Sequence, residues 1–243
     1  MLEVRRRALD LRLMNPRVAL LIAFISMLCP HDIHASPRES ARLKTIFVFG
    51  DSLSDGFGLK RREAYPALLV DKLRAARLPF EVVNASASGG TTEGGLGRLP
   101  SHLKRKIDIF ILELGVNDAF LGMPVEQIRD NLQEIIDKVK QRNPSARIVI
   151  VGMQLPNYSA DDYVSAFGQM YPDLAAKNGA ALVPYLLAGV GGDPALNLPD
   201  QIHPNVAGHK ILAENVWHVL EPIAREMTKL SSRAQPRDIA FDD

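Results

Sequence analysis

The chain has 243 residues, of which 47% are hydrophobic and 23% are charged, and its formal net charge is +1. This composition is ordinary for a globular protein, and the length is sufficient to bury a core without disulfides or metals. Only 6% of the residues are aromatic and no basic stripe with interleaved aromatic residues occurs, so we expect no nucleic-acid partner.

The N-terminal segment has the three-part layout of a secretory signal. A basic stretch at 1–17 precedes an apolar run from Val18 to Leu28, and a short polar stretch then reaches Ala35. An apolar run of this length fits an export signal, whereas a membrane-spanning helix needs about 20 apolar residues. We therefore expect a signal peptide at 1–36, cleavage after Ala35, and no stable membrane span once the signal is removed.

Two alternatives for this segment remain open: translation beginning at Met14 gives a more compact signal, and an uncleaved segment would act as an N-terminal anchor. Removal of residues 1–36 takes away five basic and three acidic residues, which leaves 24 basic and 25 acidic ones. Such a nearly neutral domain has no charge preference for a polyanionic partner. The one cysteine, Cys29, lies in the signal, so the exported domain, expected in the periplasm or secreted, has neither a disulfide nor a thiol nucleophile.

Apolar runs then alternate with segments of helical periodicity. The expected strands cover residues 44–49, 80–86, 108–115, 146–153 and 180–185. The expected helices cover residues 64–78, 124–144, 161–179 and 205–227. This alternation predicts parallel βαβ units and hence a three-layer α/β/α sandwich with a central parallel sheet of about five strands. Because no linker or repeat interrupts the core at 44–227, residues 37–243 are expected to form one domain with a polar C-terminal tail.

Polar, turn-prone segments lie at the ends of these strands. "GDSLS" at 50–54 follows the first strand, a Gly- and Ser-rich stretch at 84–97 follows the second, and "GVND" at 115–118 follows the third. "DQIHP" at 200–204 precedes the last helix. Because ligands bind outside the carboxyl ends of parallel strands, we expect these four segments to form one site.

Ser52 is the candidate nucleophile, although a serine after an aspartate also forms ordinary polar turns. Serine chemistry needs a base for the hydroxyl proton, a group that orients the base, and donors for the developing oxyanion. His203 is a suitable base, and Asp200, three residues earlier, is placed to orient it. The alternative for Asp200 is a role only in helix entry.

The expected oxyanion donors are the N–H of Ser52, an N–H of the Gly-rich stretch and the side-chain amide of Asn117. Asp51 and Asp118 are expected to hold their loops by hydrogen bonds and not to react. His209 has no further ligands at useful spacing, so we expect neither a metal nor a cofactor.

Together the four segments resemble, in order and spacing, the four sequence blocks of the SGNH, or GDSL-type, hydrolases. The resemblance extends from Lys44 to Glu226, and the connecting segments resemble the branch of exported bacterial arylesterases and multifunctional acyl-CoA thioesterase/lysophospholipases. It implies a flavodoxin-like fold. The catalytic residues that it implies are Ser52 as nucleophile, His203 as base and Asp200 as its orienter. The oxyanion hole that it implies comprises Ser52, Gly89 and Asn117.

The resemblance further implies hydrolysis of carboxylic esters and thioesters through an acyl-enzyme on Ser52. The substrate would be a small-molecule ester or thioester with an acyl chain, and we expect a monomer. Residues near the strand ends are expected to line an acyl groove: Leu53, Phe120, Leu121, Met123, Leu155 and Tyr158. Val116 stands where this branch often has glycine, and Gly90 stands where it often has an acidic residue, so a difference from the branch is expected in substrate preference.

Two other functions are compatible with the same sequence. An O-acetyl esterase of cell-wall or plant polysaccharides would use the same catalytic residues, and a non-catalytic flavodoxin-like binding module would leave Ser52 unreactive. Activity against acyl chains of different length distinguishes the first alternative. Labelling of Ser52 by a fluorophosphonate distinguishes the second.

Overall fold

The structure, a computed structural model, describes residues 43–156 and 161–234. These residues belong to a compact unit that begins at Leu43 and is separate from residues 1–42. The signal expected at 1–36 and the candidate lining residue Tyr158 lie outside the described residues. None of the helices formed by the described residues combines the length and apolar character that a membrane crossing requires.

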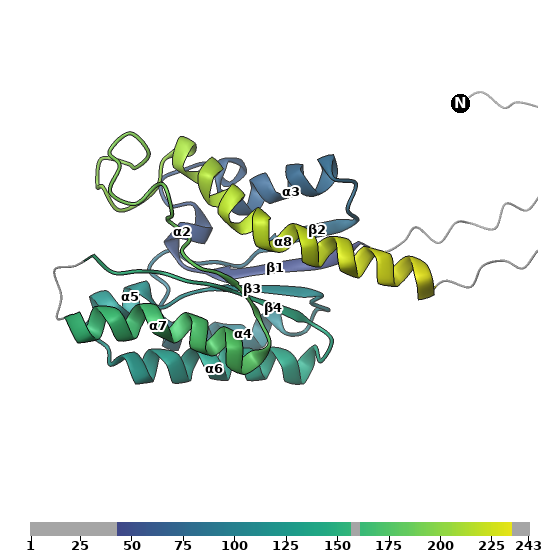
Figure 1. Cartoon of the computed structure of the whole chain (residues 1–243), viewed down its shortest axis with the longest axis horizontal. Coiled ribbons are helices and arrows are strands. Elements are labelled where there is room, and N and C mark those ends of the chain that lie inside the picture. Colours follow the sequence, from purple (N-terminus) through teal and green to yellow (C-terminus); the bar gives the residue numbers. More distant parts are fainter. Residues whose placement is uncertain (1–42, 157–160, 235–243) are drawn as a thin grey trace, which may run out of the picture. The chain divides into compact units, whose positions relative to one another are not determined.

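Five parallel strands form the central sheet in the order β2-β1-β3-β4-β5 (Figure 1). The strands are β1 (Lys44–Gly50), β2 (Phe80–Asn84), β3 (Ile109–Glu113), β4 (Arg147–Val151) and β5 (Ala181–Val183). Every residue of β3 is buried, as expected for a parallel strand covered on both faces. The strand order is that of flavodoxin-like doubly wound sheets, which confirms the predicted fold class.

Helices cover both faces of the sheet (Figure 1). On one face lie α3 (Tyr65–Ala75) and α8 (Val206–Ala234), which pack against each other. On the other face lie α4 (Thr92–His102), α6 (Val125–Arg142) and α7 (Asp161–Asn178). The shorter helices are α2 (Ser52–Asp55), the 3₁₀ helix η2 (Arg61–Glu63) and α5 (Val116–Phe120). The four helices expected from periodicity are thus present, with ends shifted by at most three residues in α3, α6 and α7, whereas α8 continues seven residues beyond the expected end at 227.

Helix α6 shows how the sequence pattern produces the packing. Pro124 precedes its first turn, and Lys140 and Arg142 in the last turn complement the negative end of the helix dipole. Apolar residues recur at intervals of three or four and are at most 1% exposed: Ile128, Leu132, Ile135, Ile136 and Val139. Burial of each such side chain contributes about 1.5–3 kcal/mol, which drives this face onto the sheet.

Helix α4 is not predicted by the sequence analysis, which treats this stretch as a Gly-rich loop. Its residues include several of low helix propensity: Gly94, Gly95, Gly97 and Pro100. Two hydrogen bonds at its start offset that propensity: Thr91 caps the helix locally by accepting from the Gly94 N–H at 3.1 Å, and the distant Asp118 accepts from the Thr92 N–H. A Cβ on Gly95 would lie 2.8 Å from Leu114 Cδ1, so glycine permits the close approach of α4 to the segment that follows β3.

The carboxyl ends of β1 and β3 lie side by side, with Gly50 paired to Glu113. Strand β2 flanks β1 on its other side, so the chain reverses its winding direction between β1 and β3. In doubly wound sheets such a switch point opens a crevice for ligands. Helix α2 follows β1 and helix α5 follows β3, and Ser52 and Asn117 therefore lie at the same edge of the sheet.

The carboxylate of Asp118 fastens α4 to α5. Asp118 is fully buried, and its oxygens accept hydrogen bonds from the Thr92 N–H at 2.9 and 3.0 Å and from the Thr92 hydroxyl at 2.5 Å. Asn131 of α6 in turn donates to the same hydroxyl at 2.9 Å. The expected role of Asp118 in holding its loop is confirmed.

We predict that Asp118→Asn lowers the free energy of unfolding by about 1–3 kcal/mol, because the new amide group places a donor where the wild type accepts buried hydrogen bonds. Urea unfolding at neutral pH measures the change. The matched control is Asp71→Asn on the exposed side of α3, which should shift stability by less than about 0.5 kcal/mol. An Asp118→Asn protein as stable as wild type would contradict this account.

Candidate active site

The segment that follows β1 turns sharply to present Ser52. Asp51 is the N-cap of α2, and its Oδ1 accepts a hydrogen bond from the Leu53 N–H at 2.9 Å. Gly56 ends this one-turn helix in the left-handed conformation with φ of 84°, a geometry that favours glycine. Ser52 is consequently held at the start of a capped turn with its side chain 8% exposed.

Asp200 and His203 meet Ser52 from the loop that leads into α8. The His203 Nε2 lies 3.0 Å from the Ser52 Oγ, and the His203 Nδ1 lies 2.8 Å from the Asp200 Oδ2. The loop folds around the Asp200 side chain, whose Oδ1 accepts from the N–H groups of Ile202 at 2.9 Å and His203 at 3.0 Å. The structure thus brings together the three residues that the sequence analysis selected from segments about 150 positions apart.

The charge state of Asp200 sets the tautomer of the ring. Hydrogen bonds from the backbone of His203 and Ile202, and from the His203 side chain, lower the pKa of Asp200 to about 2. The ionised carboxylate accepts only, so the His203 Nδ1 carries the proton and donates. In the neutral ring this leaves Nε2 as the acceptor for the Ser52 hydroxyl.

Asn117 and the loop of Gly89 lie beside the same turn. The Asn117 amide donates to the Asp51 Oδ2 at 3.2 Å and to the Gly90 carbonyl at 3.0 Å. Gly89 has a φ of 73°, and no described residue accepts a hydrogen bond from its N–H. The described residues likewise provide no acceptor for the Ser52 N–H. The site therefore contains two unengaged backbone donors, whereas the Asn117 amide already donates to two acceptors.

His209 lies near the site in sequence but has a structural role. It is 1% exposed, and its Nδ1 accepts a hydrogen bond from the Tyr65 N–H at 3.1 Å. Burial lowers the pKa of His209 to about 4, so the ring remains neutral and joins α8 to α3. Among the residues that the structure describes, no cluster of His, Cys, Asp and Glu is suited to hold a metal ion.

Comparison with known proteins identifies the family of this chain. Residues 48–211 match the model of the GDSL-like Lipase/Acylhydrolase family. The chain belongs to this family. Its relatives include the Esterase TesA of Pseudomonas aeruginosa, which is 39% identical over 76% of this chain and 92% of the relative. The Thioesterase 1/protease 1/lysophospholipase L1 of Escherichia coli K12 is 35% identical over 76% of this chain and 87% of the relative.

The fold of this GDSL-like acylhydrolase is also that of solved family members. A crystal structure of TesA covers 74% of this chain and 99% of its own chain, with 39% identity and a TM-score of 0.71. The family match at 48–211 includes the segments that carry Ser52, Asn117 and His203 in this chain. The resemblance seen in the four sequence blocks is therefore confirmed at the level of the family.

The residues expected to line an acyl groove occupy different environments in this acylhydrolase. Leu53 and Leu155 are 4% and 9% exposed and belong to the hydrophobic core. Met123 is half-buried, and its carbonyl accepts a hydrogen bond from the Tyr163 hydroxyl at 2.6 Å. Phe120 and Leu121, at the end of α5, are 61% and 75% exposed.

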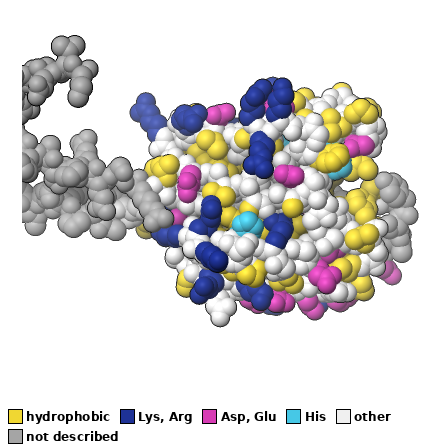
Figure 2. Space-filling view, turned by 180° about the vertical axis from the view of Figure 1, so that it is seen from behind, with side chains coloured by type: hydrophobic (Ala, Val, Ile, Leu, Met, Phe, Trp, Pro, Cys, Tyr) yellow, Lys and Arg dark blue, Asp and Glu magenta, His cyan; other side chains and the backbone are white. Residues whose placement is uncertain are grey.

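Most of the large exposed apolar side chains among the described residues lie in segments of the site. The Phe57 ring, 47% exposed, lies 4.4 Å from the His203 ring, and Ile202 and Val206 flank His203 on the loop and on α8. Together with Phe120 and Leu121 they form what we call the apolar rim. In Figure 2 hydrophobic side chains gather along the right-hand edge of this face, whereas Lys and Arg are spread over the remainder.

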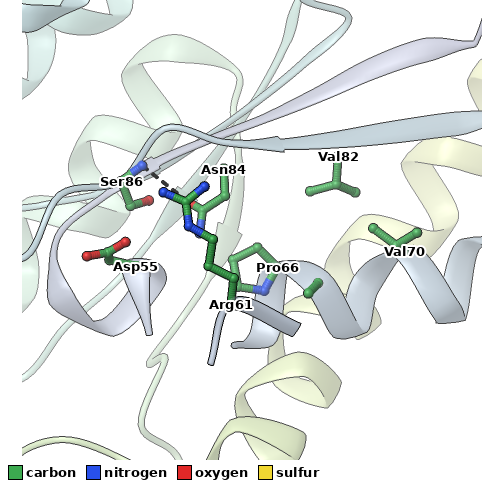
Figure 3. A pocket seen from close by; sticks show the side chains of 8 residues that line it. Asp55, Arg61, Pro66, Val70, Val82, Asn84 and Ser86 are labelled. Atoms are coloured by element: carbon green, nitrogen blue, oxygen red, sulfur yellow. Dashed lines mark hydrogen bonds between the residues drawn. The ribbon is translucent and has the colours of Figure 1, made fainter. Parts of the chain in front are cut away.

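A cavity of about 210 Å³ opens on the α3 side of α2. Its apolar lining consists of Pro66, Ala67, Val70 and Val82, and its polar lining consists of Asp55, Arg61, Asn84 and Ser86. In Figure 3 the guanidinium of Arg61 lies beside Asn84 and Ser86. Asp55 accepts hydrogen bonds from the N–H and the hydroxyl of Ser88, the neighbour of Gly89, at 3.3 and 2.7 Å. This Arg61 pocket thus adjoins the loop of the candidate oxyanion donor.

Two charged residues next to the site are missed by the sequence analysis. Glu113 ends β3 and is fully buried, and Arg98 of α4 donates to the Gly50 carbonyl at 2.9 Å. The sequence does contain a pattern that could have identified Glu113: an acidic residue lies between apolar residues in a run that predicts a strand buried on both faces. Arg98 has no such signal, because it lies in the helix that was not predicted.

Proposed function

We propose that this protein is a serine hydrolase that cleaves carboxylic esters and thioesters through an acyl-enzyme on Ser52. The observation that carries the proposal is the continuous pair of contacts from Asp200 to His203 at 2.8 Å and from His203 to Ser52 at 3.0 Å. This is the arrangement by which a histidine activates a serine hydroxyl. The names of the relatives, esterase and thioesterase/lysophospholipase, support the same class of reaction.

In the proposed mechanism His203 acts first as base and then as acid. Its Nε2 takes the Ser52 proton as Oγ attacks the carbonyl carbon, and the Asp200 carboxylate stabilises the imidazolium that forms. His203 then gives the proton to the leaving alcohol or thiol, and the acyl group remains on Ser52. Water, activated by the same ring, hydrolyses the acyl-enzyme in the second half of the cycle.

The proposed oxyanion donors are the N–H groups of Ser52 and Gly89 and the amide of Asn117. The Gly89 N–H is free in the described structure and needs no rearrangement. The Asn117 amide has to exchange one of its present acceptors, the Asp51 carboxylate or the Gly90 carbonyl, for the oxyanion. Asn117 lies on α5, which follows β3, and Gly89 lies in the loop between β2 and α4.

The apolar rim is the proposed binding surface for the acyl chain. Phe120 ends α5, the helix that carries Asn117, and Leu121 is its C-cap, while the Phe57 ring contacts the ring of His203. Exposed apolar side chains therefore lie on the segments of both an oxyanion donor and the base. A chain of several methylene groups gains about 0.8 kcal/mol for each CH₂ that it buries. A polysaccharide acetyl group would leave most of this apolar surface unused, which favours the acyl ester over the O-acetyl substrate.

The Arg61 pocket is the proposed position of an anionic leaving group such as the phosphates of an acyl-CoA. Arg61 forms no ion pair with any described residue, and it lies beside the buried Ser86 hydroxyl, for which the described residues provide no partner. A guanidinium and hydroxyl donors together suit a phosphate group. The hydrogen bond from the Ser88 hydroxyl to Asp55 joins the lining of this pocket to the loop of Gly89.

We also propose export to the periplasm or outside the cell, with the substrate hydrolysed there by a monomer. The support is the basic and apolar layout of residues 1–36 and the absence of cysteine from the rest of the sequence. A fractionation experiment that finds the full-length chain in the cytoplasm would contradict this assignment.

The first prediction concerns the nucleophile. Ser52→Ala should abolish hydrolysis of p-nitrophenyl esters while the far-UV circular dichroism stays unchanged, since the substitution removes only the attacking oxygen. Ser101→Ala, an exposed serine on α4, is the matched control and should retain wild-type turnover. A folded Ser52→Ala protein with full turnover would refute the mechanism. Activity restricted to acetyl esters across a panel of acyl lengths would favour the O-acetyl esterase.

The second prediction concerns the oxyanion donor. Asn117→Ala should lower kcat by about 10²–10³ with a small effect on KM, because the lost hydrogen bond forms in the transition state. Asn117→Asp, which keeps the shape but not the donor, should lose a similar factor. A change in KM alone, with kcat unaffected in both variants, would show that Asn117 is not an oxyanion donor.

The third prediction concerns the leaving group. Arg61→Ala should raise KM for an acyl-CoA by about two- to fivefold, the effect of one solvent-exposed charge contact, and leave p-nitrophenyl ester kinetics unchanged. Steady-state kinetics with both substrates at low salt measure the difference. Arg74→Ala, an exposed arginine on α3, is the control. Equal effects of Arg61→Ala on both substrates would argue against a phosphate site.

A further inference from the structure

Two buried carboxyl groups meet beneath the nucleophile. Asp51 and Glu113 are both fully buried, and Asp51 directly follows Gly50, the residue that is paired with Glu113 in the sheet. A Cβ on Gly50 would lie 2.5 Å from the Glu113 Oε2, so only glycine lets the carboxyl group approach this turn. The pair is therefore built into the register of β1 and β3.

One oxygen of Glu113 organises the turn and the other has no partner. Oε2 accepts hydrogen bonds from the Asp51 N–H at 3.2 Å and from the Ser54 hydroxyl at 2.7 Å, and Ser54 is itself bonded to the Tyr65 hydroxyl at 2.7 Å. Oε1 is buried, and no described residue donates a hydrogen bond to it. If Glu113 were ionised, its buried Oε1 would carry negative charge without a hydrogen-bond donor to stabilise it.

The described residues provide no ion pair for this carboxyl group. Arg98 is the neighbouring cation, but its guanidinium donates to the carbonyls of Gly50 and Ala85 and lies 3.6 Å from the centre of the Phe49 ring. Two buried carboxylates in contact cannot both ionise without such a partner. The other titratable groups that act on the pair are Tyr65 of α3, Asp118 of α5, Tyr171 of α7 and His203 of the loop before α8.

The hydrogen bonds of the two carboxyl groups assign the proton. Burial raises the pKa of Asp51 to about 6 and raises the pKa of Glu113 well above its ordinary value. Both oxygens of Asp51 accept hydrogen bonds, whereas the Glu113 Oε1 has no donor among the described residues. Glu113 is thus the member that keeps the proton, and Asp51, which accepts from Leu53 and Asn117, is the member that ionises.

We propose that Glu113 is a neutral positioning residue, which shares a proton with Asp51, fixes the turn before Ser52 and leaves the Asp51 carboxylate to hold the Asn117 amide. This inference rests on the proposed function, since it concerns the residues that place the nucleophile and the oxyanion donor. Glu113 itself touches neither substrate nor reacting atoms. Its effect passes through the Asp51 N–H, the Ser54 hydroxyl and the Asp51 carboxylate.

The shared proton links folding to pH. On this proposal Glu113 retains its proton at neutral pH in the folded protein, because burial raises its pKa well above the ordinary value of about 4.5 at which the unfolded chain loses the proton. Above that pH Glu113 therefore binds one proton in the folded state that it lacks in the unfolded state. Its contribution to stability is complete below about pH 4.5 and declines as pH rises towards the folded-state pKa.

The test is Glu113→Gln, whose amide has the shape of the neutral acid and can donate to Asp51. Wild type releases the Glu113 proton when it unfolds, and the variant does not. Between about pH 5 and 7 the unfolding equilibrium constant of wild type should therefore rise with pH more steeply than that of the variant, by about tenfold per pH unit. Urea unfolding across this range measures the slope. Glu93→Gln, an exposed acid on α4, should keep the wild-type slope. An unchanged slope in Glu113→Gln would overturn the proposal.

The kinetic readout separates positioning from simple loss of packing. Glu113→Gln should keep kcat within about threefold of wild type at pH 8, whereas Glu113→Ala should lose about tenfold or more in kcat with little change in KM. Rescue of kcat by glutamine is expected only if the wild-type residue is neutral. A Glu113→Gln variant as impaired as Glu113→Ala would contradict neutrality.

A measurement on the wild-type protein covers the case in which the variants fail to fold. Infrared difference spectra in D₂O at pH 8 should contain the carbonyl band of a buried protonated carboxylic acid, and its absence would overturn the proposal. The band is independent of turnover. A protein that shows the band but hydrolyses no ester would refute the proposed function alone, and an active esterase without the band would refute the shared proton alone.

Discussion

The pairing of β1 with β3 is the constraint on which the site depends. It places Gly50 opposite Glu113 and so brings a buried carboxyl group under the turn that carries Ser52. The same two strand ends continue into α2 and α5, which hold Ser52 and Asn117. A shift in register would move the nucleophile, its supporting acid and the amide relative to one another, since all three are attached to these two strands.

His203 and Asp200 are organised differently, because they form a local unit. Asp200 accepts two backbone hydrogen bonds and one ring hydrogen bond from within a four-residue turn, so the imidazole is oriented before it meets the sheet. The buried His209 then fixes the first turns of α8 against α3 through Tyr65. The site thus joins one rigid sheet edge to one preassembled loop, and the contact between the His203 ring and Ser52 is the point where the two meet.

The sheet, the four long helices and the meeting of Ser52, Asp200 and His203 can be predicted from the sequence. Apolar periodicity indicates the strands and helices, and the order of the motifs indicates which segments form the site. The sequence does not allow α4 to be predicted, since three glycines and Pro100 oppose helix formation and the stabilising acid, Asp118, lies 26 residues from Thr92. The roles of Glu113 and Arg98 depend on register and burial, which no local pattern reports. The exposed or buried state of the expected lining residues also depends on packing, as Leu53 and Leu155 show.

The two hydrogen bonds of the Asn117 amide have a consequence for selectivity between ground state and transition state. In the resting protein this donor is satisfied by the Asp51 carboxylate and the Gly90 carbonyl. A neutral ester oxygen is a weaker acceptor than a carboxylate, so an arriving substrate does not draw the amide away. Only an oxygen that has acquired negative charge competes for it. Under the proposed mechanism the amide therefore does not contribute to binding of the neutral substrate. It donates a hydrogen bond to the substrate oxygen only when the carbon has become tetrahedral and the oxygen is negatively charged.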